Sequence, residues 1–288
     1  MSDAMVMPSS RRKTATLVML YTVLVGYSLI TLAPFIWMLI TSFKAPSDVF
    51  KIPPSFVPTM LFTDEPFANY TEVWTKRSFV TFFLNSAWVA FMASLGQVFA
   101  TSLAGYAFAR LELPGKNVLF AVVLATAFVP VEVTIIPEFL IMRWLGWIDT
   151  FASLIVPSFL VGAFGTFMLR EYFASLPRDY GDAAYVDGAS PFQIFYMVYL
   201  PLAQPALVSV FVIAFINNWN ELLRPLLFLN SPDKLTVPLG LMSFVNQYEA
   251  SWTLLMAGSV ISTVPLILIY ILTQRYILQG FVGGGVKG

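Results

Sequence analysis

The sequence predicts an all-α membrane protein with six transmembrane helices, and two observations lead to this fold class. Hydrophobic residues make up 58% of the 288 residues and charged residues 11%, with a mean hydropathy of +0.77. These values are typical of a polytopic membrane protein rather than of a soluble domain. Several uncharged runs are also long enough to cross a hydrocarbon core of about 30 Å at about 1.5 Å per helical residue.

The polar composition excludes several kinds of chemistry. The formal net charge is +0, which gives no indication of a nucleic-acid partner. The chain contains no cysteine and no histidine, so it has no disulfide, no thiolate nucleophile and no imidazole ligand for a metal. No paired intramembrane aspartates are present either. We therefore expect a membrane protein without enzymatic activity and without a metal or cofactor of its own.

The first two spans are separated by a long polar segment. Residues 1–13 are polar and end in three basic residues, and residues 14–42 carry no charge. This apolar run is too long for the core of a signal peptide, so it predicts a retained first span. Residues 44–77 are rich in proline and predict an external loop with little regular structure. Residues 79–109 predict the second span, which ends at a tight turn over residues 110–116.

The third and fourth spans follow with one irregularity. Residues 117–142 predict the third span, although this run contains Pro130, Glu132 and Pro137. A short external turn at residues 146–149 leads to the fourth span at residues 150–169. Glu132 lies about 21 Å along a helix that starts at Val118. Ionisable groups at such depth usually face a wet cavity, so Glu132 is a candidate pathway residue; a carboxylate at a proline-broken helix end in the outer leaflet explains it equally well.

The fifth and sixth spans enclose another external segment. Residues 200–219 predict the fifth span and residues 252–272 the sixth. Between them, residues 224–251 predict an external segment with a short helix or re-entrant piece at residues 235–244. Residues 274–288 form a glycine-rich tail. Six spans put both termini on the same side, and a slight excess of Lys and Arg on that side favours the cytoplasm.

The polar stretch between the fourth and fifth spans contains the start and stop signals of two short helices. Asp179 to Asp187 predict a short helix, which Gly188 ends. Ser190 and Pro191 predict a second helix, because serine caps free backbone amides and proline suits the first helical position. Leu200-Pro201 then leads into the fifth span. The sequence therefore predicts a short helix, a bend and a second helix joined to a transmembrane segment.

This stretch resembles the EAA loop of the membrane-spanning subunits of bacterial ABC importers, with Asp182-Ala183-Ala184, Asp187-Gly188-Ala189 and Leu200-Pro201 in matching places. An aspartate replaces the usual glutamate, which keeps the charge and shortens the reach. In that family the loop docks on a cytoplasmic ATPase, and the resemblance implies the same role for these residues. An ordinary amphipathic loop between two spans is the alternative.

Two further motifs resemble the carbohydrate branch of the same family. Trp219-Asn220-Glu221 matches a signature at the end of the fifth span, and Gln274 to Gly288 matches the tail of the maltose-type second subunit. In the family this tail inserts between the ATPase subunits, which implies ATPase contacts for Gln279, Gly280 and Lys287. A disordered end is the alternative. Asn217, Asn218 and Asn220 are candidate sugar contacts, although a helix C-terminus anchored by Trp219 also explains them.

The resemblance implies a type I importer transmembrane domain in a bacterial inner membrane. Residues 1–78 would hold the first span and external loop, residues 79–276 the permease core with a coupling helix at about 179–190, and residues 277–288 the cytoplasmic tail. The implied partners are a second permease subunit, giving a heterodimer, two ATPase subunits that bind ATP and Mg, and an extracytoplasmic solute-binding protein. The implied cargo is a sugar, a polyol or a sugar-phosphate.

A self-contained secondary transporter is the alternative function. Such a protein would be expected to show inverted repeats and paired intramembrane charges, but no internal repeat is visible and only Glu132 is well placed. The chain also lacks a G-x-x-x-x-G-K-[ST] motif, so the sequence predicts that ATP hydrolysis takes place on partner subunits.

Overall fold

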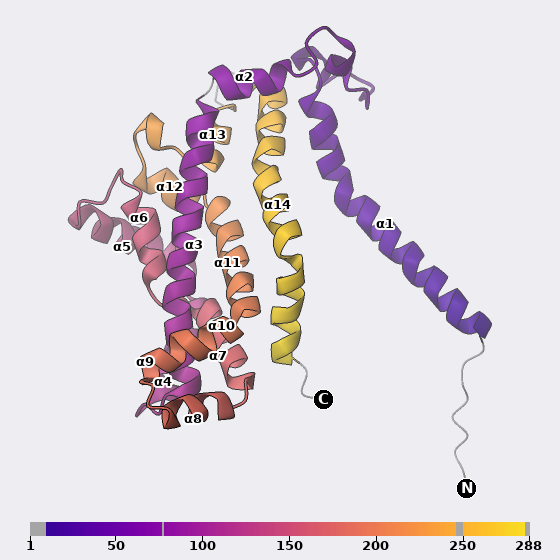
Figure 1. Ribbon diagram of the computed structural model, residues 1–288. Helices are drawn as coiled ribbons and strands as arrows, with labels where there is room; N and C mark the ends of the chain where they lie inside the picture. The colour runs from indigo at the N-terminus through magenta and orange to yellow at the C-terminus, as the bar shows by residue number, and fades with distance from the viewer. Residues whose placement is uncertain (1–9, 77, 246–249, 286–288) are drawn as a thin grey trace. The chain divides into compact units, whose positions relative to one another are not determined.

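The computed structural model describes residues 10–76, 78–245 and 250–285, and most of them lie in helices (Figure 1). The chain divides into two compact units, which are described separately. The first contains residues 1–73 and 247–261, and the second contains residues 74–246 and 262–288. Within the described ranges, four helical segments are long and apolar enough to cross a membrane, and two bent helix pairs bring the number to six.

The first unit contains α1 (Ser10–Ser42) and the loop that follows it. The loop holds two short 3-10 helices, Pro46–Asp48 and Thr59–Phe62, and then α2 (Ala68–Lys76) begins. The expectation of little regular structure in this loop was therefore wrong for α2. The side-chain amide of Asn69 donates to the carbonyl oxygens of Ser42 at 2.8 Å and Lys44 at 3.0 Å, which fixes the start of α2 against the end of α1.

The second unit is built around α3 (Phe79–Arg110), against which α7 (Ala163–Ser175) and α11 (Gln204–Trp219) pack. Small residues allow the close approach of α3 and α7. A Cβ on Gly105 would meet the Leu169 Cβ at 2.9 Å, and a Cβ on Gly165 would meet the Thr101 side chain at 2.9 Å. Glycine at such contacts is typical of membrane helix pairs, in which close backbone packing replaces the hydrophobic effect.

Shorter helices complete the second unit, and the predicted second span and both predicted short helices are confirmed. The remaining helices are α4 (Lys116–Ala125), α5 (Val131–Trp144), α6 (Ala152–Ile155), α8 (Asp179–Val186), α9 (Pro191–Ile194), α10 (Leu200–Leu202), α12 (Leu223–Phe228) and α13 (Val237–Met242). Helix α14 (Trp252–Gly285) begins in the first unit and continues in the second. In Figure 1, α8 and α9 lie near the Arg110 end of α3, whereas α12 and α13 lie toward its Phe79 end.

The predicted third span is not one straight helix. The segments Lys116–Phe128 and Val131–Trp144 meet at 102°. Pro130 stands at the start of α5, and Val129 before it is extended, with φ −86° and ψ 114°. A residue that precedes proline is driven out of the helical region by the proline ring, which explains the break. Glu132 consequently lies in the first turn of a new helix and is exposed.

The predicted fifth span begins later than expected. The segments Pro191–Leu202 and Gln204–Trp219 meet at 79°, so Leu200 to Leu202 belong to the arm before the bend. Pro201 and Pro205 flank the bend at Ala203, and neither has an amide hydrogen for a continuous helical ladder. A π-helical turn at Phe195–Tyr199 precedes it.

The predicted glycine-rich tail is helical from Gln274 as far as Gly285. Helix α14 continues through Pro265 to Gly285. The structure describes the backbone of Gln279 and Gly280 but not their side chains, and Lys287 lies outside the described residues. The predicted ATPase contacts of these three residues therefore remain predictions.

Candidate functional site

Helix α8 begins and ends through local interactions that its sequence specifies. Asp179 and Asp182 stand in its first turn, where carboxylates interact favourably with the helix dipole. At its end, the Gly188 amide donates to the Tyr185 carbonyl and the Ala189 amide to the Ala184 carbonyl, both at 3.0 Å. This pattern is a Schellman motif, which requires a left-handed residue, and Gly188 has φ +84°.

The helix that follows α8 starts with a capping box. The Ser190 hydroxyl accepts from the Gln193 amide at 3.4 Å, and the Gln193 side chain accepts from the Ser190 amide at 2.7 Å. Pro191 occupies the first helical position. The chain therefore turns sharply between α8 and α9, and both sides of the turn are held by bonds within the stretch itself.

The structure divides the candidate coupling residues into an outer and an inner set. Asp182, Ala183, Asp187 and Gly188 are exposed. Ala184, Ala189 and Leu200 instead pack against buried residues of the second unit, and Pro201 lies at the bend. Sequence analysis missed the most exposed apolar side chains of α8, which are Tyr185 at 71% and Val186 at 85%. Two large apolar residues inside a polar stretch were the sequence signal that could have identified them.

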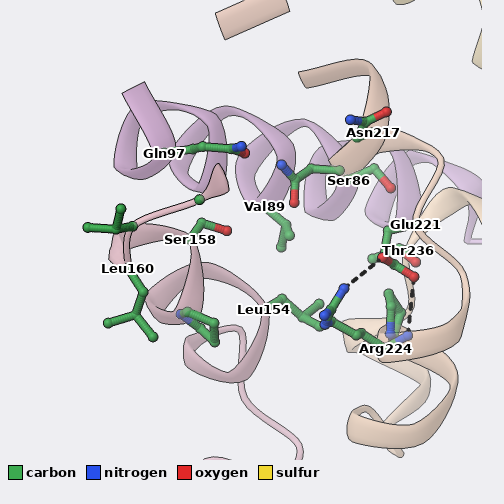
Figure 2. Close-up of a pocket in the computed structure, with 15 residues that line it drawn as sticks. Ser86, Val89, Gln97, Leu154, Ser158, Leu160, Asn217, Glu221, Arg224 and Thr236 are labelled. Atoms are coloured by element: carbon green, nitrogen blue, oxygen red, sulfur yellow. Dashed lines mark hydrogen bonds and ion pairs between the residues drawn. The ribbon is translucent and has the colours of Figure 1, made fainter. Parts of the chain in front are cut away.

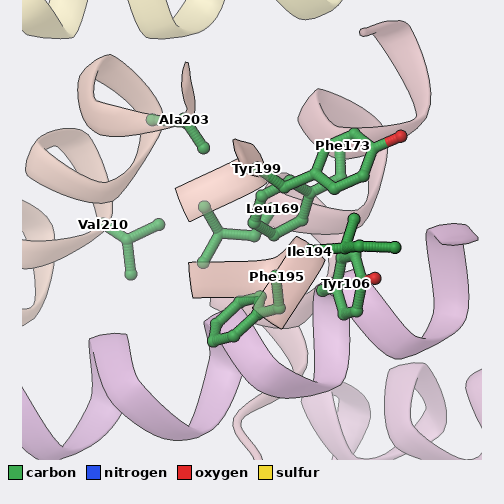
Figure 3. Packing of buried hydrophobic residues seen from close by; sticks show 9 residues of the cluster. Tyr106, Leu169, Phe173, Ile194, Phe195, Tyr199, Ala203 and Val210 are labelled. Atoms are coloured by element: carbon green, nitrogen blue, oxygen red, sulfur yellow. The ribbon is translucent and has the colours of Figure 1, made fainter. Parts of the chain in front are cut away.

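A buried cluster joins this stretch to the helices of the second unit (Figure 3). The Tyr106 ring of α3 lies 5.1 Å from Phe195, 5.5 Å from Tyr199 and 6.1 Å from Phe173. Its hydroxyl donates to the Pro191 carbonyl at 3.0 Å. One side chain of α3 thus contacts the end of α7, the start of α9 and the π-helical turn.

Arg110, the last residue of α3, makes a second junction. Its Nη2 donates to the carbonyl oxygens of both Phe173 and Leu176 at the end of α7, and its guanidinium lies 4.7 Å from the Tyr199 ring. Free carbonyls at a helix C-terminus are favourable partners for a cation. Tyr199 in turn contacts α8, because a Cβ on Gly181 would lie 2.6 Å from the Tyr199 hydroxyl.

These contacts surround a cavity of about 350 Å³ between α8 and α3, which we call the α8 cavity. Its charged lining residues are Arg110, Glu112, Lys116, Arg178 and Asp182. Of the candidate coupling residues, only Asp182 lines it.

A second cavity of about 310 Å³ lies beside the first half of α3, and we call it the α12 cavity (Figure 2). Its lining combines aliphatic side chains with polar ones from α3, the end of α11 and α12. The polar side chains include Ser86, Gln97, Asn217, Asn218, Glu221 and Arg224. Its volume is at the lower end of the range of small-molecule sites, which is roughly 300–1,000 Å³.

Among the described residues, Arg224 is the one cation that lines the α12 cavity, and two carboxylates hold it. Its Nε lies 2.9 Å from Glu138 of α5, and its Nη1 lies 3.2 Å from Glu221. Glu221 also accepts from the Leu223 and Arg224 amides, at 3.0 and 3.4 Å, and so caps α12. Burial alone would lower the pKa of Arg224, but the hydrogen bonds and charges of Glu138 and Glu221 outweigh it and raise this pKa.

Several polar groups at the α12 cavity have no partner within the described chain. Thr236 is 4% exposed, and its hydroxyl makes no hydrogen bond. The side-chain amides of Gln97 and Asn217 likewise have none among the described residues. A buried hydroxyl without a partner is costly, so a bound water or ligand group is expected there.

The structure places two of the four candidate pathway residues in this cavity. Asn217 and Asn218 line it. Asn220 does not, and its side chain donates to the Ile216 carbonyl at 2.8 Å, as a helix-end residue does. Glu132 is also outside the lining. The residues missed were Glu138 and Gln97; each is a polar residue within an apolar run, which was the available signal.

A carboxylate in the turn before α6 joins two turns of the second unit. Asp149 accepts from the amides of Asn230 and Ser231, each at 2.9 Å, from the Ser231 hydroxyl, and from Lys234 at 3.2 Å. The Ser231 hydroxyl is the main cause that lowers the pKa of Asp149, and the two amides add to it. The turn before α6 is thereby tied to the turn before α13.

Long apolar helices, two proline-bent pairs and a short polar helix between spans define a multi-pass membrane protein with the fold of a type I importer transmembrane domain. The chain belongs to the family of binding-protein-dependent transport system inner membrane components, which matches residues 97–282. It is a permease component of an ABC importer of the inner membrane.

Similar proteins support this assignment over nearly the whole chain. The arabinooligosaccharides transport system permease protein AraQ of Halalkalibacterium halodurans is 31% identical over 96% of this chain and 100% of that protein. The inner membrane ABC transporter permease protein YcjP of Escherichia coli is 31% identical, over 97% and 100%. A crystal structure of a bacterial ABC transporter that imports the acidic polysaccharide alginate matches with a TM-score of 0.79 and 26% identity, over 94% of this chain and 99% of that one.

Proposed function

We propose that this chain forms half of the translocation pathway of a carbohydrate importer and that α8 couples it to a separate ATPase. The supporting observation is the exposed surface of α8, where Tyr185 and Val186 project from a helix held firmly from behind. Large exposed apolar side chains on a short polar helix are typical of a contact surface for another protein. Exposed Ala183 and Gly188 permit close approach, and exposed Asp182 and Asp187 can pair with basic residues.

The rest of the proposed assembly follows from the family and the relatives. The partners are a second permease subunit, two ATPase subunits that bind ATP and Mg, and an extracytoplasmic solute-binding protein. Both termini face the cytoplasm, because α8 must face the ATPase and an even number of spans returns the chain to that side. The name of the arabinooligosaccharide permease supports a sugar cargo, and the family resemblance extends the proposal to a polyol or a sugar-phosphate. The chain itself binds no nucleotide and catalyses no reaction.

The contacts behind α8 suggest how force passes through this chain. Movement of α8 acts on Tyr199 through Gly181, and Tyr199 contacts both Arg110 and Tyr106. These two residues join α3 to the end of α7 and to the start of α9. A displacement of α8 therefore moves the ends of α3 and α7 and the start of α9 together, as expected for a rigid-body transition between inward-facing and outward-facing states.

The test of coupling is Val186→Asp in the complete importer, reconstituted in vesicles. We expect the ATPase subunits to dissociate or lose cargo-stimulated hydrolysis, because the substitution buries a charge in the proposed interface. Val186→Thr is the matched control, since it keeps the shape and adds no charge. Normal stimulation in Val186→Asp would refute the coupling role of this surface.

Orientation has an independent test, because the chain contains no cysteine. Ala183→Cys, in the chain expressed without the ATPase subunits that would cover it, should react with a membrane-impermeant thiol reagent in inverted vesicles and not in right-side-out cells. Reaction in intact cells would place α8 outside and overturn the proposed topology. Purified alone, the chain should neither hydrolyse ATP nor transport; strong transport by the isolated chain would favour a secondary transporter.

A further inference from the structure

The α12 cavity contains a charged group that is already neutralised. Within the described chain Arg224 is its only lining cation, and Glu138 and Glu221 hold it at 2.9 and 3.2 Å. Two carboxylates against one guanidinium leave one net negative charge beside the cavity. Arg224 is 32% exposed and Glu138 is 16% exposed at the side chain, so solvent screens this charge only in part.

An anionic ligand would meet unfavourable electrostatics in this cavity. A carboxylate, sulfonate or phosphate is usually bound by an unpaired Arg or Lys, or by several free backbone amides. Here the guanidinium is already paired, and the amides of Leu223 and Arg224 at the start of α12 are bound by Glu221. An anion would therefore add negative charge beside a guanidinium whose charge is already compensated by two carboxylates.

The remaining polar groups suit an uncharged ligand rich in hydroxyl groups. Gln97 and Asn217 present amides without partners among the described residues, and each amide both donates and accepts. The Thr236 hydroxyl is buried, lines the cavity and is unpartnered. Figure 2 shows these groups around one space, with Ser158 on the opposite wall from Arg224. Hydroxyl groups satisfy such donors and acceptors without introducing a charge.

We propose that the α12 cavity is a binding subsite for an uncharged, hydroxyl-rich segment of the cargo, and that Glu138 and Glu221 exclude anionic cargo by occupying Arg224. The inference rests on the proposed function, since it assigns the cavity to the translocation pathway. It removes sugar-phosphates and acidic sugars from the candidate cargoes. Its two elements, charge and ligand class, are testable separately.

The charge is measured with a single introduced cysteine, Ser158→Cys, in a complete importer whose other subunits lack reactive thiols. Reaction rates with a cationic and an anionic methanethiosulfonate are compared, each normalised to a free thiol. We expect the anionic reagent to be disfavoured by roughly threefold to tenfold relative to the cationic one, given one partly screened charge at short range. Ser175→Cys, exposed at the far end of α7, should show no such preference.

Charge-neutral variants then identify the source of the preference. Adding Glu221→Gln or Glu138→Gln to Ser158→Cys should abolish it, because the remaining carboxylate then only balances Arg224. Glu171→Gln is the matched control, since Glu171 pairs with Arg170 and does not line the α12 cavity. A preference for the anionic reagent in the unmodified cavity, or an equal effect of Glu171→Gln, would overturn the electrostatic assignment.

The ligand class is measured by protection of Ser158→Cys from a small uncharged thiol reagent. The probes are uncharged disaccharides, namely lactose, maltose and galactobiose, and digalacturonate, which differs from galactobiose only in its carboxylates. We expect slower labelling with at least one uncharged sugar and none with digalacturonate. Protection by digalacturonate, or by no sugar, would overturn the subsite. ATP-driven uptake in the same vesicles tests the importer function separately, so the two failures are distinguishable.

Discussion

The two cavities of the second unit lie along the same helix but differ in how their walls are held. Around the α8 cavity, Tyr106, Tyr199 and Arg110 bond to or pack against neighbouring elements. Around the α12 cavity, Thr236, Gln97 and Asn217 lack partners within the described chain. One end of α3 is thus stabilised by internal contacts, whereas the other keeps polar groups available. The difference agrees with our proposals that the first transmits movement and the second receives a ligand.

The largest effect is expected from a substitution that breaks the junction made by Arg110 at the α8 cavity. Arg110→Ala removes the charged donor shared by the Phe173 and Leu176 carbonyls and the contact with Tyr199. We expect a loss of about 2–4 kcal/mol in unfolding free energy, since a hydrogen bond to a charged group contributes about 1.5–3 kcal/mol. Thermal unfolding of the purified complex measures this. Arg110→Lys should retain only part of the stability that Arg110→Ala loses, because an ammonium lacks the planar fork that reaches both carbonyls.

The contact between α8 and Tyr199 gives the next largest effect. Gly181→Ala places a Cβ 2.6 Å from the Tyr199 hydroxyl, so one of the two elements must shift. Overpacking of this kind costs about 1–3 kcal/mol, and transport per ATP hydrolysed should fall with it. Tyr199→Phe removes the clashing oxygen and should rescue Gly181→Ala in part, because ring carbons remain at 3.2 and 3.3 Å. Purely additive effects in the double variant would contradict this contact.

At the α12 cavity, breaking the Glu138–Arg224 pair should change cargo handling more than folding. Glu138→Gln keeps a hydrogen-bond acceptor but removes a charge from a partly exposed pair. We expect about 1 kcal/mol or less in stability, because solvent screens pairs of this kind. Cargo-stimulated ATP hydrolysis should differ clearly from that of the unmodified importer, whereas the unfolding temperature should stay close to its unmodified value. The reverse order of effects would show that the pair beside the α12 cavity serves only structure.

The smallest effect concerns Asp149 and depends on pH. In the folded protein the pKa of Asp149 lies below its ordinary value of 3.8. The stability that the ionised carboxylate contributes is therefore present in full above pH 3.8, and it is lost as the pH falls toward the lowered pKa. Asp149→Asn removes this contribution. The difference in unfolding temperature between the two proteins should therefore be constant well above pH 3.8 and shrink below it. A difference that grows on acidification would contradict the assigned hydrogen bonds.

The amino-acid sequence by itself determined the number of spans and the ends of the short helices, because these depend on residues close together in the chain. The apolar runs predicted six spans, because span length depends only on composition over a short window. Gly188 predicted the end of α8 and Ser190-Pro191 the start of α9, since these caps use backbone groups within five residues. Pro130 was visible in the third span, although its effect was underestimated. The motif resemblance also predicted the family that the comparisons show.

Only the tertiary structure decided which distant residues meet. Glu138 and Arg224 are 86 positions apart, and Arg110 finds its carbonyl partners 63 and 66 positions away. No periodicity in the sequence specifies such pairs, because they depend on how α3, α5, α7 and α12 pack after two proline bends have redirected the chain. The same packing placed Asn217 in a cavity and left Asn220 at a helix end. Hydrophobic length is a property of each segment, whereas a site is a property of several segments together.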